Sequence, residues 1–171
     1  PVYRQLYADT LTPVSAFQKV SETDYAFLLE SADGGEKIAK YSTIGSNPFA
    51  GFKCKGSNVE IFNKEGITHI ETTDPFKALE QQISKFSPVR VNGLPDFFGG
   101  AVGYTSYDSV RYVETLPDST TDDLNLPDMY FMFYDETIVF DHLNKTIKVV
   151  CAAHIDERDI QDVYEDAVNK I

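Results

Sequence analysis

The sequence predicts an α+β fold built on a mainly antiparallel β-sheet with a few packed helices. Two observations lead to this prediction. Short segments rich in aromatic and β-branched residues follow one another with Gly-containing turns between them, as in consecutive antiparallel hairpins. Few segments show the three- and four-residue apolar spacing of a helix. A length of 171 residues suits one compact domain, so we expect residues 1–171 to form a single domain.

The first half of the chain alternates between one helix, a run of strands and a second helix. Thr12 and Pro13 are typical of the N-cap and first position of a helix that runs to about Val20. Asp74 and Pro75 begin the second helix in the same way. The strands expected between the helices are residues 25–31, 37–44, 49–55, 58–62 and 67–71. The apolar stripe that should face the sheet in the second helix is Phe76, Leu79, Ile83 and Phe86.

The second half contains the strongest strand signals. Residues 99–104 predict a buried strand because small residues admit close packing, and a short helix follows at 106–112. The polar, acidic segment 117–127 predicts an exposed loop. Asp156 is the expected N-cap of a last helix. The aromatic and β-branched strands are 129–134, 137–141 and 146–152, with a turn at 142–145. The apolar positions of the last helix are Ile160, Val163, Tyr164, Ala167, Val168 and Ile171.

Charge and hydropathy exclude two classes of partner. The formal net charge is −12 and no Lys/Arg cluster appears, so nucleic acids and anionic membranes would be repelled. No apolar run approaches the roughly 18 to 20 residues of a membrane span, and no basic and apolar leader is present. We therefore expect a cytoplasmic protein. Cys54 and Cys151 lack CxxC spacing, which favours two buried thiols over a disulfide.

Neither a metal site nor a nucleophile is indicated. Cys151 and His154 have CxxH spacing, but two ligands make only half of a tetrahedral zinc site. Asp118, Asp122 and Asp123 do not follow the EF-hand spacing, so a solvated loop is the favoured interpretation. No GxSxG motif is present. We expect no catalytic residue and no metal ligand in this chain.

A glycine run admits two interpretations. Gly99, Gly100 and Gly103 form a GGxxG pattern that lacks the Lys-Ser/Thr ending of a phosphate loop and the full dinucleotide fingerprint. Close packing of a strand against a helix is favoured, and a phosphate-binding loop is the alternative.

Several motifs resemble anthranilate synthase component I, in the amino-terminal region of that family. Leu28, Leu29, Glu30 and Ser31 form an LLES run, followed by a GGE turn at 34–36. The other motifs are YSxIG at 41–45, PVYR at 1–4, GGAVGY at 99–104 followed by Tyr107-Asp108 and Arg111-Tyr112, and LPDMY at 126–130 followed by Tyr134-Asp135. Together they span nearly the whole chain in the order of the family.

The resemblance implies an enzyme of tryptophan biosynthesis. Such an enzyme converts chorismate, with ammonia from a glutamine amidotransferase subunit (component II), into anthranilate and pyruvate with the help of Mg²⁺. It also implies that the chorismate-binding catalytic domain and the magnesium ligands lie beyond Ile171. This chain would then be a regulatory domain that is inactive alone. Pro1 at the start and a last helix without a terminating residue also predict a piece of a longer protein.

The resemblance further implies an L-tryptophan feedback site that includes the LLES run. Glu30 could bind the ammonium group, and the Ser31 hydroxyl could serve the polar end of the ligand. Leu29 and Tyr41 could cover the indole. Lys40 stands where the resemblance leads us to expect Arg, so its contact with a carboxylate would be less directional. Without the resemblance, an exposed Glu30 is more often solvated.

Two alternative functions remain at this stage. The first is aminodeoxychorismate synthase component I, although Glu30 within LLES favours anthranilate synthase; an assay for the ortho- or para-amino product distinguishes them. The second is a self-standing amino-acid-binding module without a catalytic domain.

Overall fold

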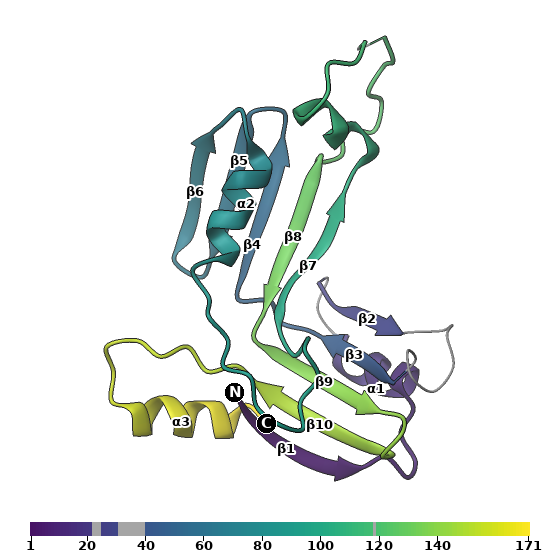
Figure 1. Cartoon of the computed structure of the whole chain (residues 1–171), viewed down its shortest axis with the longest axis vertical. Coiled ribbons are helices and arrows are strands. Elements are labelled where there is room, and N and C mark those ends of the chain that lie inside the picture. The colour runs from purple at the N-terminus through teal and green to yellow at the C-terminus, as the bar shows by residue number, and fades with distance from the viewer. Residues whose placement is uncertain (22–24, 31–39, 118) are drawn as a thin grey trace. The chain divides into compact units, whose positions relative to one another are not determined.

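The computed structural model describes residues 1–21, 25–30, 40–117 and 119–171 (Figure 1). The chain divides into two compact units, each with its own five-stranded sheet. The first unit contains residues 1–48, 88–100 and 134–171, and the second contains residues 49–87 and 101–133. All the strand pairs with an assigned register are antiparallel, which confirms the predicted α+β class. The single-domain expectation stays a prediction.

The sheet of the first unit joins distant parts of the sequence. Its strand order is β1 (Val2–Tyr7), β10 (Thr146–Cys151), β9 (Glu136–Asp141), β3 (Tyr41–Gly45) and β2 (Phe27–Glu30). β3 pairs with β2 on one side and with β9 on the other. In this register Glu30 lies opposite Ser42, and Ser42 lies opposite Phe140. A segment near residue 30 is thereby brought beside a turn that is more than 100 residues away.

Apolar clusters cover both faces of this sheet. Helix α1 (Pro13–Val20) begins at the predicted N-cap, where Thr12 Oγ1 accepts a hydrogen bond from the Ser15 backbone N–H at 3.1 Å. One cluster combines α1 with the sheet through Ala16, Ile44, Phe140 and Ile147. A separate cluster contains Phe98, Val139 and Val150. Because successive strand residues point to opposite faces, Phe140 and Val139 belong to different clusters.

The second unit has one helix packed on its sheet. The strand order is β6 (Gly66–Glu71), β5 (Asn58–Asn63), β4 (Ala50–Lys55), β8 (Met129–Tyr134) and β7 (Gly100–Thr105). Helix α2 (Pro75–Ile83) lies along β4 and β5 (Figure 1). The core between helix and sheet is formed by Phe52, Cys54, Val59, Ala78, Leu79, Met129 and Phe133. A short 3₁₀ helix, η1 (Tyr107–Tyr112), follows β7 as predicted.

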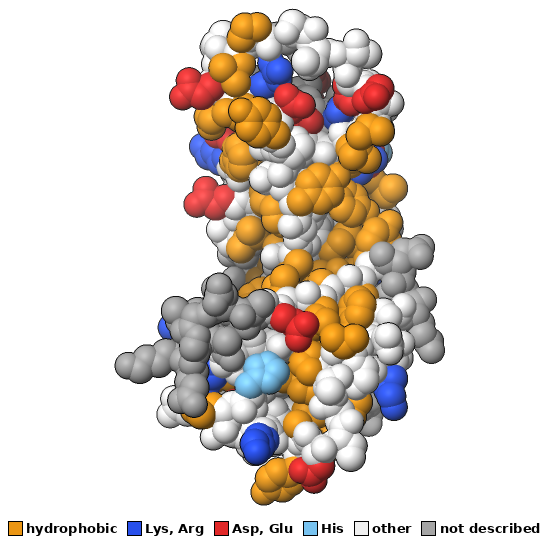
Figure 2. Space-filling view, turned by 90° about the vertical axis from the view of Figure 1, so that its right-hand side faces the viewer, with side chains coloured by type: hydrophobic (Ala, Val, Ile, Leu, Met, Phe, Trp, Pro, Cys, Tyr) orange, Lys and Arg blue, Asp and Glu red, His pale blue; other side chains and the backbone are white. Residues whose placement is uncertain are grey.

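Hydrophobic side chains also gather at the surface of the second unit, in the upper half of the view in Figure 2. Tyr104 of β7 is 42% exposed, and the centroid of its ring lies 6.4 Å from that of Tyr130. The Tyr130 ring in turn lies 6.3 Å from Phe62. These three rings form an aromatic row across β7, β8 and β5.

The start of the last helix differs from the prediction. Helix α3 (Ile160–Asn169) is capped by Asp159, whose Oδ1 accepts a hydrogen bond from the Gln161 backbone N–H at 2.8 Å. The predicted cap, Asp156, instead accepts the backbone N–H and the Nε–H of Arg158. An aspartate that bonds two residues ahead forms a local turn, so Asp156 stabilises the turn before the helix.

Burial of β7 and α2 also differs from the prediction. β7 was expected to be buried, but it is the edge strand of its sheet and Gly100 and Tyr104 are exposed. Its close approach is to the neighbouring strand β8 and not to a helix. In α2, Leu79 of the predicted stripe is buried, together with Pro75 and Ala78. The three other predicted stripe residues, Phe76, Ile83 and Phe86, are 38%, 46% and 38% exposed.

β1 was not expected as a strand, and five of its six residues are exposed. Cys54 and Cys151 are free and buried, as predicted, and burial raises the pKa of both thiols. No helix within the described ranges is long and apolar enough to cross a bilayer.

Candidate functional site

The candidate site lies in the first unit, where β2 ends beside the start of β3. Glu30 is the last residue of β2 and is exposed. Ser42, its partner in β3, is 2% exposed. The Ser42 Oγ lies 3.4 Å from Glu30 Oε1 and 2.7 Å from His142 Nε2. A carboxylate, a buried hydroxyl and an imidazole thus form one hydrogen-bonded cluster, which we call the Glu30 cluster.

The register of three strands creates this cluster. β3 is the middle strand of the three. Its Ser42 lies opposite Glu30 of β2 on one side and opposite Phe140 of β9 on the other. His142 is two residues beyond Phe140 and therefore belongs to the same face of the sheet. The backbone N–H of His142 donates to the Lys40 carbonyl at 3.0 Å, which continues the pairing of β3 and β9 by one step.

Lys40 and Tyr41 form the cationic part of the site. Lys40 Nζ lies 4.9 Å from the centroid of the Tyr41 ring. The pKa of Lys40 is raised, first by its contact with the Tyr41 side chain and to a smaller extent by the charge of Asp141. Tyr41 packs against the cluster of Phe98 and Val139. The ammonium group of Lys40 is therefore charged at neutral pH and held near an aromatic ring.

The described residues among those predicted for the site lie on β2 and at the start of β3. Leu29 is 48% exposed and lies opposite Thr43 in the sheet. Because strand residues alternate between faces, Leu29 and Glu30 point to opposite sides of β2. Ser31 lies outside the described residues. The structure brings Glu30 together with Ser42, and Lys40 together with Tyr41. β2 is the last strand in the order of its sheet.

Sequence reasoning missed Ser42, Asp141 and His142 as neighbours of the site. Ser42 stands inside the YSxIG motif, so its position beside Tyr41 was a usable signal. His142 is 100 residues further along the chain and was interpreted only as part of a turn. Its place in the site follows from strand register alone.

A buried ion pair lies under the site. Asp141 is 2% exposed and Lys148 is 5% exposed, with 3.8 Å between Asp141 Oδ2 and Lys148 Nζ. Burial by itself would raise the pKa of Asp141. Hydrogen bonds from the backbone and side-chain amides of Asn144, with the charges of Lys148 and Lys40, outweigh burial and lower that pKa. Asp141 is therefore a carboxylate at neutral pH.

Two of the residues considered as metal ligands, Asp122 and His154, have ionic partners, and Asp118 lies outside the described residues. Within the described ranges, no three His, Cys, Asp and Glu side chains come together as a metal-binding group. Asp122 pairs with Lys55, which lowers the pKa of Asp122. His154 Nε2 lies 3.2 Å from Asp135 Oδ2. The expectation that this chain has no metal ligand stays a prediction.

The Asp135–His154 contact predicts a pH-dependent stability. Burial by itself would raise the pKa of Asp135, but the hydrogen bond with His154 and the charge of Lys170 outweigh it and lower the pKa. A lowered pKa stabilises the folded chain above the unfolded value of about 3.9, and this stabilisation is lost as the pH falls through the folded pKa. In Asp135→Asn, the free energy of unfolding should therefore fall less steeply below about pH 4 than in the parent.

This prediction is checked by urea unfolding at a series of pH values. Asp9→Asn, a change at an exposed aspartate, is the matched control and should follow the parent curve. Parallel curves for Asp135→Asn and the parent would contradict the assigned role of the Asp135 carboxylate.

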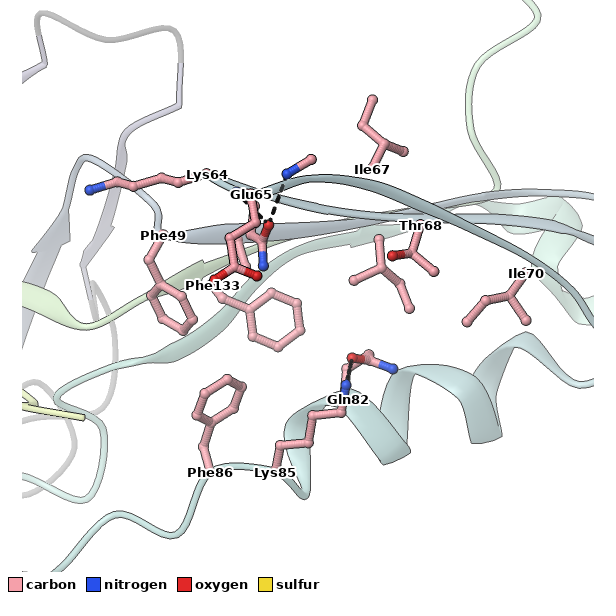
Figure 3. A pocket seen from close by; sticks show the side chains of 14 residues that line it. Phe49, Lys64, Glu65, Ile67, Thr68, Ile70, Gln82, Lys85, Phe86 and Phe133 are labelled. Carbon is pink, nitrogen blue, oxygen red and sulfur yellow. Dashed lines mark hydrogen bonds between the residues drawn. The ribbon is translucent and has the colours of Figure 1, made fainter. Parts of the chain in front are cut away.

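A cavity lies in the second unit, between α2 and the hairpin of β5 and β6 (Figure 3). Its volume is about 580 Å³. Phe49, Phe86 and Phe133 point toward one another at one end of it, with the Phe49 and Phe86 ring centroids 5.4 Å apart. Lys64, Glu65 and Lys85 belong to its lining. Lys85 Nζ donates to Gln82 Oε1 at 2.6 Å, so this ammonium group already has a partner. The size suits a small molecule, but no buried polar group that would orient one is evident among the described lining residues.

Comparison with known proteins gives the family. The family model of chorismate binding enzymes matches residues 24–170. Anthranilate synthase component 1 of Acetivibrio thermocellus is 39% identical over 171 residues, which is 100% of this chain and 34% of that protein. The protein of the same name from Acinetobacter calcoaceticus is 36% identical over 179 residues, covering 100% of this chain and 35% of its own length.

A solved structure agrees with the sequence relatives. The crystal structure of anthranilate synthase component I from Streptococcus pneumoniae TIGR4 has a TM-score of 0.61 and 25% identity, covering 96% of this chain and 35% of that chain. The chain spans about a third of the length of these relatives. The resemblance that the sequence motifs indicated is confirmed, and the chain belongs to the family of chorismate binding enzymes as a relative of anthranilate synthase component I.

Proposed function

We propose that this chain is the tryptophan-sensing, amino-terminal part of an anthranilate synthase component I. The complete enzyme converts chorismate and ammonia into anthranilate and pyruvate. The observation that carries the proposal is similarity over the full length of the chain to proteins named anthranilate synthase component 1. The opposite charges of Glu30, at the end of β2, and Lys40, directly before β3, support the choice of a free amino acid as ligand.

The chemistry of the site suits a zwitterion. A free amino acid presents an ammonium and a carboxylate, and both must be matched when water is removed. The Glu30 carboxylate binds the ammonium group, and Lys40 attracts the carboxylate. Lys40 is two residues from Ser42, the partner of Glu30, which is about 7 Å along the strand. Long side chains can close this distance around one ligand. Leu29 and Tyr41 provide apolar surface for the indole, and Ser31 supplies a further polar contact.

Inhibition follows if tryptophan prefers one of two states. We expect bound tryptophan to favour the arrangement of the enzyme that binds chorismate poorly. Typical couplings of about 1–3 kcal/mol change affinity by roughly 5- to 150-fold, which is enough for feedback control. The coupling is reciprocal, so chorismate should weaken tryptophan binding by the same factor.

The remaining components of the proposed enzyme are outside residues 1–171. A glutamine amidotransferase, component II, delivers ammonia, and the chorismate-binding catalytic domain follows this chain. That domain would hold the Mg²⁺ that assists the reaction. In this chain the described carboxylates near the site have other partners: Glu30 lies within hydrogen-bonding distance of Ser42, and Asp141 pairs with Asn144 and Lys148. We propose that the chain alone is inactive and that the enzyme is cytoplasmic.

Replacing Glu30 tests the proposed site. In the full-length enzyme, Glu30→Gln should raise the inhibition constant of tryptophan about tenfold or more, because a charge-assisted hydrogen bond to the ammonium group contributes about 1.5–3 kcal/mol. The constant is measured from anthranilate fluorescence, relative to the uninhibited rate of each protein. Glu157→Gln, at an exposed position of the same unit, is the control. Equal inhibition constants for Glu30→Gln and its parent would refute the site.

A further inference from the structure

The Glu30 cluster contains two residues to which neither the motifs nor the relatives assign a role. We infer that Ser42 and His142 are positioning residues, which fix the Glu30 carboxylate in the orientation that binds the ammonium group of the ligand. This inference rests on the proposed function, because it assigns Glu30 to ammonium binding. Ser42 is buried and hydrogen-bonded to both Glu30 and His142, and the His142 backbone makes a second contact with Lys40.

The direction of the hydrogen bonds follows from the single proton of the Ser42 hydroxyl. A serine hydroxyl can donate one hydrogen bond and accept others. The Glu30 carboxylate only accepts, so the 3.4 Å contact between Ser42 Oγ and Glu30 Oε1 requires that proton. The 2.7 Å contact with His142 must then be donated by Nε2 to Ser42 Oγ. The result is a relay from His142 Nε2–H to Ser42 Oγ–H to the carboxylate.

Burial makes this relay rigid on the serine side. Ser42 is 2% exposed and lies in the middle strand of three, so its backbone is held on both sides. Glu30 has an exposed side chain at the end of β2. An exposed glutamate samples several rotamers, and ordering it on binding opposes affinity. A fixed hydroxyl beneath the carboxylate reduces that loss.

His142 also connects the two charged halves of the site. Its backbone N–H donates a hydrogen bond to the Lys40 carbonyl at 3.0 Å, and its ring is hydrogen-bonded to Ser42. The backbone contact is independent of the side chain, so replacing the ring leaves the position of Lys40 unchanged. Substitutions at His142 therefore separate the effect on the ammonium end of the ligand from the effect on its carboxylate end.

The first experiment compares two ligands in the full-length protein. Calorimetry gives the dissociation constants of L-tryptophan and of 3-indolepropionate, which lacks the ammonium group. Ser42→Ala and His142→Leu should each weaken tryptophan binding about tenfold, the size of one hydrogen bond to a charged group. Binding of 3-indolepropionate should change less than twofold. His142→Gln, whose side-chain amide can donate in place of Nε2, should recover most of the tryptophan affinity.

The outcomes distinguish the inference from the proposed function. If the parent protein binds no tryptophan, the proposed function fails. If the parent binds tryptophan and Ser42→Ala binds it equally well, only the positioning role fails. An equal loss for both ligands would also overturn the inference, because a general loss of structure does not select the ammonium group.

A second measurement needs no ligand. Long-range ¹H–¹⁵N spectra of the His142 ring in the parent chain report which nitrogen carries the proton. The relay requires a proton on Nε2, and the Nε2 shift should change in Ser42→Ala. A neutral ring protonated on Nδ1 alone would overturn the inference whatever the ligand measurements show.

Discussion

Replacing Asp141 with alanine should lower the free energy of unfolding by about 3–5 kcal/mol. Asp141 is 2% exposed and is the ion-pair partner of Lys148, which is 5% exposed. Removing the carboxylate leaves the Lys148 ammonium buried beside an apolar side chain. It also removes the acceptor of two hydrogen bonds from Asn144, at 3.0 and 2.8 Å, in the turn between β9 and β10. The loss combines an unpaired charge with a weakened turn.

Guanidinium unfolding of the chain measures this loss of unfolding free energy. Two further variants show how much of it comes from the turn and how much from the unpaired charge. Asp141→Asn keeps an acceptor for the Asn144 backbone N–H, so its difference from Asp141→Ala reports the turn. Asp141→Asn combined with Lys148→Met removes both charges and should cost less than Asp141→Asn alone, since a buried pair is replaced without leaving a charge unpaired. If the double variant loses the sum of the losses of Asp141→Asn and of Lys148→Met alone, the two side chains do not interact.

Local signals predicted most of the secondary structure. Thr12 with Pro13, and Asp74 with Pro75, marked the starts of α1 and α2 because a cap and a first-turn proline act through neighbouring backbone groups. The N-cap of α3 was assigned to the wrong residue because Asp156 and Asp159 carry the same side chain, and only the hydrogen bonds between Asp156 and Arg158 separate their roles. Sequence alone does not reveal which aspartate makes those hydrogen bonds.

Burial was harder to predict because it depends on strand order. The small residues of β7 suggested a buried strand, but the strand stands at the edge of its sheet. β1 escaped notice for the same reason, since an edge strand with exposed faces needs no apolar alternation. In α2, Pro75 and Ala78 are buried beside Leu79, while the larger Phe76 and Ile83 remain exposed. Side-chain size was therefore a poor guide to the buried face.

The same limit applies to the site. Glu30, Lys40 and Tyr41 were found because they stand in or beside motifs that can be compared along the sequence. His142 could not be found in this way, because it approaches Ser42 only through the register of β3 against β9. One residue of slip in that register would move His142 to the other face and break the cluster. The position of His142 in the site is therefore determined by the pairing of β3 with β9, which the residue types alone do not reveal.

Replacing Gly103 with alanine should cost about 3 kcal/mol or more of unfolding free energy. A Cβ at this position of β7 would lie 1.9 Å from the Tyr130 carbonyl oxygen and 2.6 Å from the Phe131 Cα. Both are backbone atoms of β8, so no flexible side chain can move aside and the strands must separate. Such a loss, measured by guanidinium unfolding without any ligand, assigns the glycine run to the close approach of two strands.

The control separates this collision from the loss of backbone freedom. Gly56 has a φ of +56°, and a Cβ added to it would meet no heavy atom of the described residues within 4 Å. Gly56→Ala therefore meets only the conformational penalty of roughly 1–2 kcal/mol. A larger loss at Gly103 than at Gly56 is the signature of the collision with β8. Equal losses at the two positions, or a Gly103→Ala chain that unfolds like its parent, would contradict the packing explanation. The phosphate-loop alternative, in which the glycine lets a ligand and not a neighbouring strand approach the backbone, would then be favoured.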